Sequence, residues 1–201
     1  MEFFRRAPTR STSAVLFPGA FNPPTRAHLA LAAAAAAWAP EVVFVLPRRF
    51  PHKEYEGPGF EDRLDLLLQA TSGNPQASVA ATGRGLFIEI ARAARAADPA
   101  LERLLVLCGR DAAERIIGWD YDEPGALPRH LGEFELLVAP RAGPYQPPPG
   151  LAHRIHPLEI AGLDDVSATG VRDRIRRGLP VETLVPASIA GRVRELYAPT
   201  E

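Results

Sequence analysis

The stretch AVLFPGAFNPPTRAH, residues 14–28, predicts the junction of a buried strand with a helix. Its first four residues are apolar, and this run ends at the turn-forming pair Pro18-Gly19. Thr25 stands where a helix that continues to residue 38 needs a capping side chain. Gly19 and Ala20 have small side chains, so backbone N–H groups could approach a phosphate here, at the positive end of the helix. The stretch therefore predicts an anion-binding turn.

His28 follows Thr25 by three residues, which places both side chains on one side of the helix start. An imidazole in this place could donate hydrogen bonds to phosphate oxygens as negative charge shifts to a leaving group. Taken alone, the stretch is equally compatible with an ordinary turn at residues 22–24 followed by a first-turn histidine.

The rest of the chain alternates apolar runs with segments of helical periodicity. We expect strands at residues 14–17, 41–46, 77–81, 104–107, 134–139 and 154–160. We expect helices at residues 25–38, 61–71, 86–97, 111–117, 169–177 and 186–197. This alternation predicts an α/β fold, a Rossmann-like doubly wound parallel sheet of five to six strands with helices on both faces. In such folds ligands bind beyond the carboxyl ends of the strands where the strand order reverses, so the loops after the first and fourth strands are the candidate site.

Composition restricts the class of protein. The chain has 201 residues, which suits one domain at residues 14–201 behind a loose tail at residues 1–13. A net charge of −1 argues against general nucleic-acid binding, and no run of about 18 apolar residues is present to span a membrane. Cys108 is the single cysteine, which excludes an intramolecular disulfide and a cysteine metal cage. Because the N-terminal segment also lacks an apolar signal core, we expect a cytoplasmic protein and leave a homo-oligomer open.

Lys53 is the only lysine among 23 basic residues, and it lies in a loop at residues 47–59 rich in proline, glycine and charge. An arginine bias of this kind suggests a GC-rich genome. A lone lysine against that background indicates either a need for a compact ammonium group or chance survival.

A second cluster, SATGVR at residues 167–172, opens a helix near the end of the chain. Ser167 or Thr169 could cap this helix, and Arg172 on its first turn could bind phosphates in a bidentate manner. The same residues are also compatible with an ordinary cap followed by a solvated basic face.

Together the two clusters resemble the (H/T)xGH and ISSTxxR signatures of the nucleotidyltransferase superfamily, in the family's order. Between them, three segments look like those of the nicotinate or nicotinamide mononucleotide adenylyltransferases. These segments are PHK at 51–53 followed by Arg63-Leu64, GRD at 109–111 followed by Trp119, and VAPRAG at 138–143. The resemblance spans residues 15–197.

The resemblance implies a role for each matching residue. His28 and Arg172 would stabilise the triphosphate and the transition state, and Thr25, Lys53, Ser167 and Thr169 would hold phosphates. The nucleotide would contact Gly19, Ala20, Phe21, Gly109 and Asp111, with Asp111 bonding a ribose or base. The acceptor would contact Asn22 and Arg141, and it would stack its pyridine ring on Trp119, unless Trp119 is a core residue.

Three departures from the family pattern affect these expectations. Ala27 replaces the usual glycine, which a helical backbone tolerates, and Ala168 replaces a serine that could contact phosphate. Residues 81–86, ATGRGL, stand where the pyridine-nucleotide enzymes carry a Thr/Tyr-rich stretch ending in Asp-Thr-Leu. This last change affects the choice of acceptor more than the reaction type.

The expected function is that of an adenylyltransferase that joins ATP to nicotinate or nicotinamide mononucleotide and releases pyrophosphate. Mg²⁺ would arrive on the ATP phosphates, so no protein metal ligand is expected. The alternatives are phosphopantetheine as acceptor, a cytidylyltransferase acting on a phospho-alcohol, or a nucleotide-binding module without catalysis. A dehydrogenase is disfavoured because no G-x-G-x-x-G follows the first strand.

Overall fold

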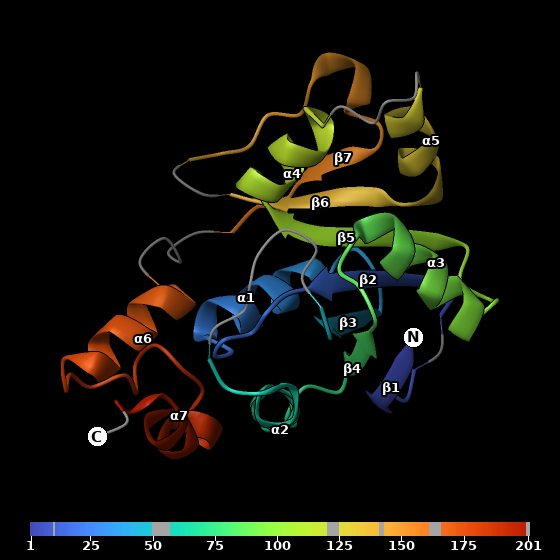
Figure 1. The fold of residues 1–201 in the computed structure, drawn as a ribbon. Helices are drawn as coiled ribbons and strands as arrows, with labels where there is room; N and C mark the ends of the chain where they lie inside the picture. Colours follow the sequence, from blue (N-terminus) through green and yellow to red (C-terminus); the bar gives the residue numbers. More distant parts are fainter. Residues whose placement is uncertain (10, 50–56, 120–124, 141–142, 161–165, 200–201) are drawn as a thin grey trace.

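The computed structural model describes residues 1–9, 11–49, 57–119, 125–140, 143–160 and 166–199. Seven strands form one sheet in the order β1-β4-β3-β2-β5-β6-β7 (Figure 1). They are β1 (Glu2–Arg5), β2 (Ser13–Pro18), β3 (Glu41–Pro47), β4 (Ala77–Thr82), β5 (Arg103–Gly109), β6 (Glu135–Ala139) and β7 (Ile155–Pro157). Strands β2 to β7 are parallel, which confirms the expected α/β fold, while β1 gives the sheet a seventh strand beyond the five to six expected.

Helices cover both faces of the sheet (Figure 1). They are α1 (Arg26–Ala35), α2 (Phe60–Ala70), α3 (Phe87–Ala97), α4 (Arg110–Ile117), α5 (Ala126–Glu133), α6 (Ala168–Arg176) and α7 (Ala190–Tyr197), with short 3-10 turns η1 (Pro149–Leu151) and η2 (Ala187–Ile189). The described part of the chain contains no helix long and apolar enough to cross a membrane.

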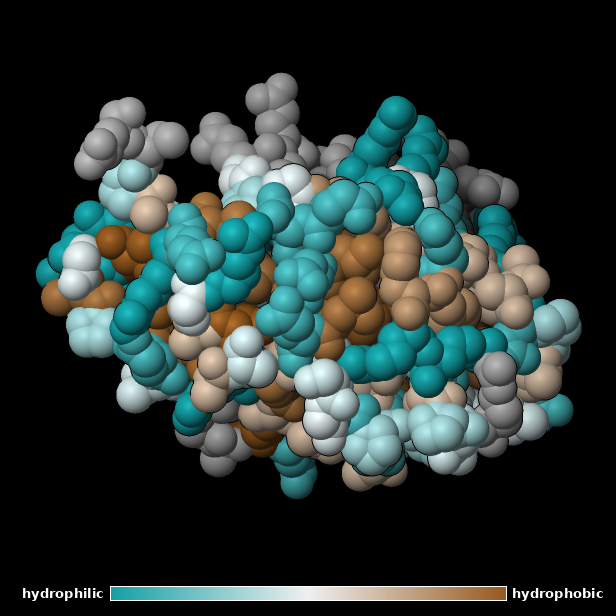
Figure 2. Space-filling view, turned by 90° about the horizontal axis from the view of Figure 1, so that it is seen from below, coloured by the Kyte–Doolittle hydropathy of each residue, from teal (hydrophilic) through white to brown (hydrophobic). Residues whose placement is uncertain are grey.

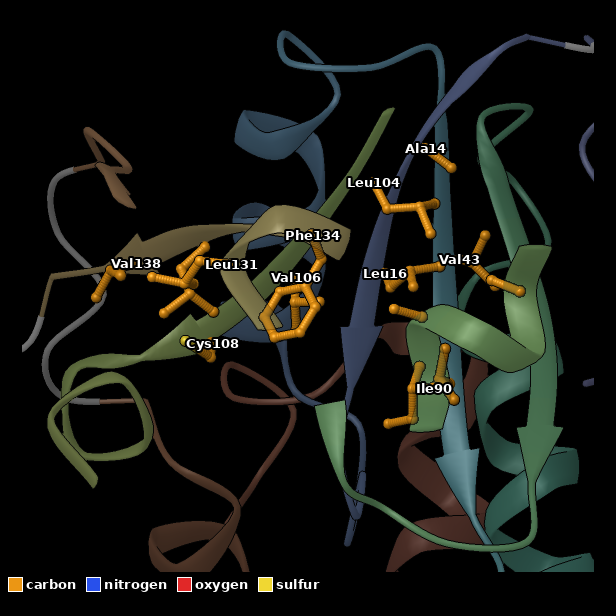
Figure 3. Packing of buried hydrophobic residues seen from close by; sticks show 14 of the residues in the cluster. Ala14, Leu16, Val43, Ile90, Leu104, Val106, Cys108, Leu131, Phe134 and Val138 are labelled. Atoms are coloured by element: carbon orange, nitrogen blue, oxygen red, sulfur yellow. The ribbon is translucent and has the colours of Figure 1, made fainter. Parts of the chain in front are cut away.

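Side chains alternate between the two faces along each strand. Leu16, Val43 and Val106 face the layer of α3, α4 and α5, where they pack with Ile90 and Leu131 (Figure 3). Their strand neighbours, among them Val15, Phe44 and Leu105, face α1 and α2. Burial on both faces explains why these strands consist mainly of continuous apolar runs.

The N-terminal segment corrects the expectation of a loose tail. Glu2–Arg5 forms β1, which pairs antiparallel with β4 at the edge of the sheet, with Glu2 opposite Ala81. The edge of β4 offers unpaired backbone groups, and the Phe3 side chain packs against the core, so pairing stabilises this segment. Arg5 adds hydrogen bonds to the Leu68 carbonyl and the Thr71 hydroxyl.

The C-terminal elements form a separate apolar cluster with α2 rather than with the sheet. It contains Leu66, Ala70, Val171, Ile175, Val181, Val185, Ile189 and Val193. In Figure 1, α6 and α7 lie beside α1 and α2 at one end of the molecule. The face of the molecule that is seen from below carries apolar and polar side chains interspersed with one another (Figure 2).

Candidate active site

A cavity of about 1000 Å³ opens at the carboxyl ends of the parallel strands. The strand order reverses between β2 and β5, which pair in parallel, and the cavity is lined by residues from the ends of both. Its walls are Phe17, Thr25, Ala27, His28, Leu31, Leu107, Cys108, Gly109, Ala139, Pro140, Gly143, Pro144, Tyr145, Pro157, Leu158, Glu159, Ile160, Val166, Ser167 and Ala168. The size is sufficient for a nucleotide-sized ligand.

The turn between β2 and α1 is held in an unusual shape. Phe21 has a positive φ of 44° and its side chain is only 1% exposed, against the rings of Phe17, Phe44 and His28. A Cβ on Gly19 would lie 2.9 Å from the tip of the Phe21 ring. Gly19 is therefore needed to admit the Phe21 ring, a different reason from the expected approach of a phosphate.

Thr25 and His28 form a reciprocal cap at the start of α1. The Thr25 hydroxyl accepts a hydrogen bond from the His28 backbone N–H, and His28 Nδ1 accepts one from the Thr25 backbone N–H at 3.0 Å. A nitrogen that accepts from an N–H carries no proton, so the imidazole proton is on Nε2. The cap thus fixes the tautomer of a histidine that lines the cavity.

Burial lowers the pKa of His28 to about 4. The imidazole is therefore neutral at pH 7 in the protein without ligand, and its Nε2–H is a donor without a charge.

The second cluster meets the first through Arg172. Ser167 caps α6 by accepting from the Gly170 N–H at 3.0 Å. Arg172 Nη1 donates to the Asn22 carbonyl at 2.6 Å, and its Nη2 donates to the Thr169 hydroxyl at 3.2 Å. Two segments 150 residues apart in the sequence are thus joined by a cation, although Asn22, Thr169 and Arg172 are not among the residues that line the cavity.

The remaining residues that the sequence predicted for the site do not all line the cavity. Gly109 lines the cavity and precedes α4, and Asp111 lies exposed in the first turn of that helix. Trp119 follows α4 with half of its surface exposed, and it is not among the residues that line the cavity. Lys53 and Arg141 lie outside the described residues.

Two arginines to which the sequence analysis assigned no role support the loops of the site. Arg63 on α2 is buried and donates to the Ala20 carbonyl at 3.0 Å. Arg110 at the start of α4 donates from Nη2 to the carbonyls of Gly143 and Pro144 at 3.0 and 2.7 Å. Both lie in segments that resemble the adenylyltransferases, Arg63-Leu64 and GRD at 109–111, but the resemblance assigned neither side chain a role.

The cavity has few groups for covalent or metal chemistry. Burial raises the pKa of the Cys108 thiol to about 12, so it is protonated and a poor nucleophile. Among the described residues there is no group of three or more His, Cys, Asp or Glu side chains able to hold a metal ion. The site can therefore orient and stabilise a phosphate-bearing ligand, with hydrogen-bond donors from both ends of the chain.

Comparisons with known proteins agree in the class of protein they indicate. The profile of the family described as cytidylyltransferase-like matches residues 16–174. A probable nicotinate-nucleotide adenylyltransferase of Dehalococcoides mccartyi is 33% identical over 150 residues, which is 67% of this chain and 69% of that protein. A probable nicotinate-nucleotide adenylyltransferase of Tropheryma whipplei is 30% identical over 197 residues, 89% of this chain and 98% of that protein.

One further relative and one solved structure are also similar to this chain. A phosphopantetheine adenylyltransferase of Symbiobacterium thermophilum is 34% identical over 187 residues, 92% of this chain and 96% of that protein. The structure of the Plasmodium falciparum nicotinic acid mononucleotide adenylyltransferase complexed with NaAD superposes with a TM-score of 0.67 at 13% identity, covering 92% of this chain and 97% of that chain. At this identity the structural likeness is one of fold.

Proposed function

The chain belongs to the cytidylyltransferase-like family and is a nucleotidyltransferase, and from this premise we propose that it transfers the adenylyl group of ATP to nicotinate or nicotinamide mononucleotide. The products would be the dinucleotide and pyrophosphate, and the reaction would belong to NAD biosynthesis.

The observation that carries the proposal is the bond between Arg172 and the Asn22 carbonyl. It brings the two signature segments to one cavity, with the α1 cap on one side and the α6 cap on the other. Two helix N-termini and an arginine suit a triphosphate.

The proposed chemistry is a single in-line displacement. A 5′-phosphate oxygen of the acceptor attacks the α-phosphorus of ATP, and the bond to the bridging oxygen of pyrophosphate breaks. The Nε2–H of His28 and the remaining N–H groups of Arg172 would stabilise the charge that develops on the phosphates. No side chain is needed as nucleophile, and Ser167, Thr169, Gly19, Ala20, Phe21 and Asn22 would position the nucleotide.

Other assignments made from the sequence remain part of the proposal. Lys53 would bind phosphate, Arg141 and Trp119 the acceptor, and Gly109 and Asp111 the ribose or base. Mg²⁺ would enter on ATP, because magnesium prefers phosphate oxygens and water, and among the described wall residues Glu159 is the one carboxylate. This donor set suits an ion carried by the substrate.

Phosphopantetheine is the second candidate acceptor. It is supported by the Symbiobacterium thermophilum relative, which covers 92% of this chain at an identity similar to that of the other relatives. The sequence at residues 81–86 also lacks the pattern of the pyridine-nucleotide enzymes.

The test is pyrophosphate release from Mg-ATP with nicotinate mononucleotide, nicotinamide mononucleotide and phosphopantetheine offered separately, with the product identified by mass. Release with one mononucleotide and formation of its dinucleotide would establish the proposed reaction. Release with phosphopantetheine alone would select the second candidate. Silence with all three while ATP binds would refute both acceptors.

A further inference from the structure

Asn22 is the residue at which the last two helices of the described chain hold the turn between β2 and α1. Its side chain is buried, with 8% of the residue exposed. Its backbone carbonyl accepts from Arg172 on α6, and its side-chain oxygen accepts from the Tyr197 hydroxyl on α7. Both oxygens of one residue are thus bound from the C-terminal side.

The position of Tyr197 is set by packing that does not involve the sheet. Its ring packs against the cluster formed by α2, α6 and α7, where Val193 on the same helix is fully buried. Arg26, the first residue of α1, donates from its backbone N–H to the Leu184 carbonyl and from Nε to the Val185 carbonyl. The C-terminal unit therefore contacts both ends of the turn, at Asn22 and at Arg26.

The turn requires such support because its backbone is strained. Phe21 directly precedes Asn22 and has a left-handed backbone, which is unfavourable for a residue with a side chain. Such a conformation persists where surrounding contacts determine it. Arg63 holds the Ala20 carbonyl on one side of Phe21, and Tyr197 and Arg172 hold Asn22 on the other.

We propose that Tyr197 is a positioning residue for nucleotidyl transfer, which fixes Asn22 and thereby keeps residues 19–22 and Arg172 in the arrangement that receives the triphosphate. Its role in turnover rests on the proposed function; its role in ordering the turn does not. Tyr197 acts through Asn22, whose side-chain oxygen accepts its hydrogen bond, and neither residue is among those that line the cavity.

The first arm of the test does not depend on activity. Hydrogen–deuterium exchange of the peptide covering residues 19–25 is compared among wild type, Tyr197→Phe and Arg194→Ala. Arg194 is the matched control, because it lies on the same helix and pairs with Glu182 at the surface. Loss of one hydrogen bond predicts exchange faster by about threefold to tenfold in Tyr197→Phe and no change in the control. Unchanged exchange in Tyr197→Phe would overturn the inference.

The second arm uses whichever acceptor the wild type accepts. We expect Tyr197→Phe to lower kcat by about threefold to tenfold while KM for the acceptor stays constant. In an Asn22→Ala background, Tyr197→Phe should have no further effect, because both changes remove the same bond. Additive losses would contradict the inference. A wild type without turnover refutes the proposed function and leaves the exchange arm decisive for Tyr197.

Discussion

The cap that Thr25 and His28 form at the start of α1 shows how the tautomer of a histidine decides which hydrogen bonds it can donate. Nδ1 of His28 is occupied by the Thr25 N–H, so the ring has Nε2–H as its one means of donating to a phosphate. Sequence reasoning identified both residues from their spacing, but it could not assign the proton, because that depends on the 3.0 Å contact within the cap.

Removal of His28 tests this donor directly. We expect His28→Ala to lose about 2–4 kcal/mol of transition-state stabilisation, roughly 30- to 1000-fold in kcat, with nucleotide binding largely intact. Steady-state kinetics and calorimetric titration with ATP measure the two quantities. His153→Ala, an exposed histidine outside the cavity, is the control. An unchanged kcat in His28→Ala would remove His28 from the mechanism.

The lowered pKa of His28 also predicts a pH dependence of stability. The ordinary pKa of about 6.5 in the unfolded chain exceeds the folded value of about 4, so the unfolded state binds more protons between these two values. The neutral imidazole stabilises the fold fully above pH 6.5, and this contribution falls as the pH drops from 6.5 towards 4. Urea unfolding at several pH values should therefore give a smaller acid loss for His28→Ala than for wild type. Parallel curves for the two proteins would contradict the assignment.

At the scale of elements, the link between α4 and the loop after β6 shapes one wall of the cavity. Arg110 holds the carbonyls of Gly143 and Pro144, and Gly143 has a left-handed φ of 103° that favours glycine. Tyr145, which follows Pro144, is buried in the core cluster and lines the cavity. The loop is thus fixed at its carbonyls by α4 and at Tyr145 by the sheet.

Arg110→Ala should loosen this wall. We expect KM for the acceptor or for ATP to rise by about an order of magnitude with a smaller change in kcat, because the loss is in the shape of the pocket. Arg110→Lys, which keeps a charged donor, should restore part of the effect. Arg115→Ala, an exposed arginine in the last turn of the same helix, serves as control and should behave like wild type. Equal KM values in Arg110→Ala and Arg115→Ala would show that the link is dispensable.

The elements that sequence reasoning missed share a physical cause. α5 contains Pro128 and Gly132, two poor helix formers, so its short helical pattern was hidden. β1 has no strong apolar run of its own and is stabilised by pairing with β4, a long-range contact that local periodicity cannot reveal. Strands β2, β3, β5 and β6 were predictable because burial on both faces gives each a run of apolar residues, whereas β4 contains the buried Ser78 and β7 is a short Ile-His-Pro segment.

At the scale of the whole molecule, the site depends on contacts between the two ends of the chain. Motifs identified Arg172 and the turn at residues 19–22 separately. Their contact through the Asn22 carbonyl follows from the packing of α6 and α7 on α2, which no motif encodes. Trp119, by contrast, was predicted from a motif to stack on the acceptor, but it is half exposed and is not one of the described residues that line the cavity.

Arg172→Ala breaks the contact that joins these ends. We expect kcat/KM for ATP to fall by about 100-fold, because a charged donor is lost at both the turn and the phosphates. Arg172→Lys should recover little, since an ammonium cannot reproduce a planar fork that bonds Asn22, Thr169 and ligand together. Arg176→Ala, which breaks a surface pair with Asp173, is the control. An unaltered ATP response in Arg172→Ala would exclude the role.

The bond from Tyr197 to Asn22 spans 175 positions of the chain, and this span has a consequence for biosynthesis. During translation the β2–α1 turn emerges early, long before its partner on α7 exists. The strained turn therefore lacks support on that side until α7 has left the ribosome and packed on α2. Nascent or prematurely terminated chains would carry the sheet and both signatures and still lack an assembled phosphate site.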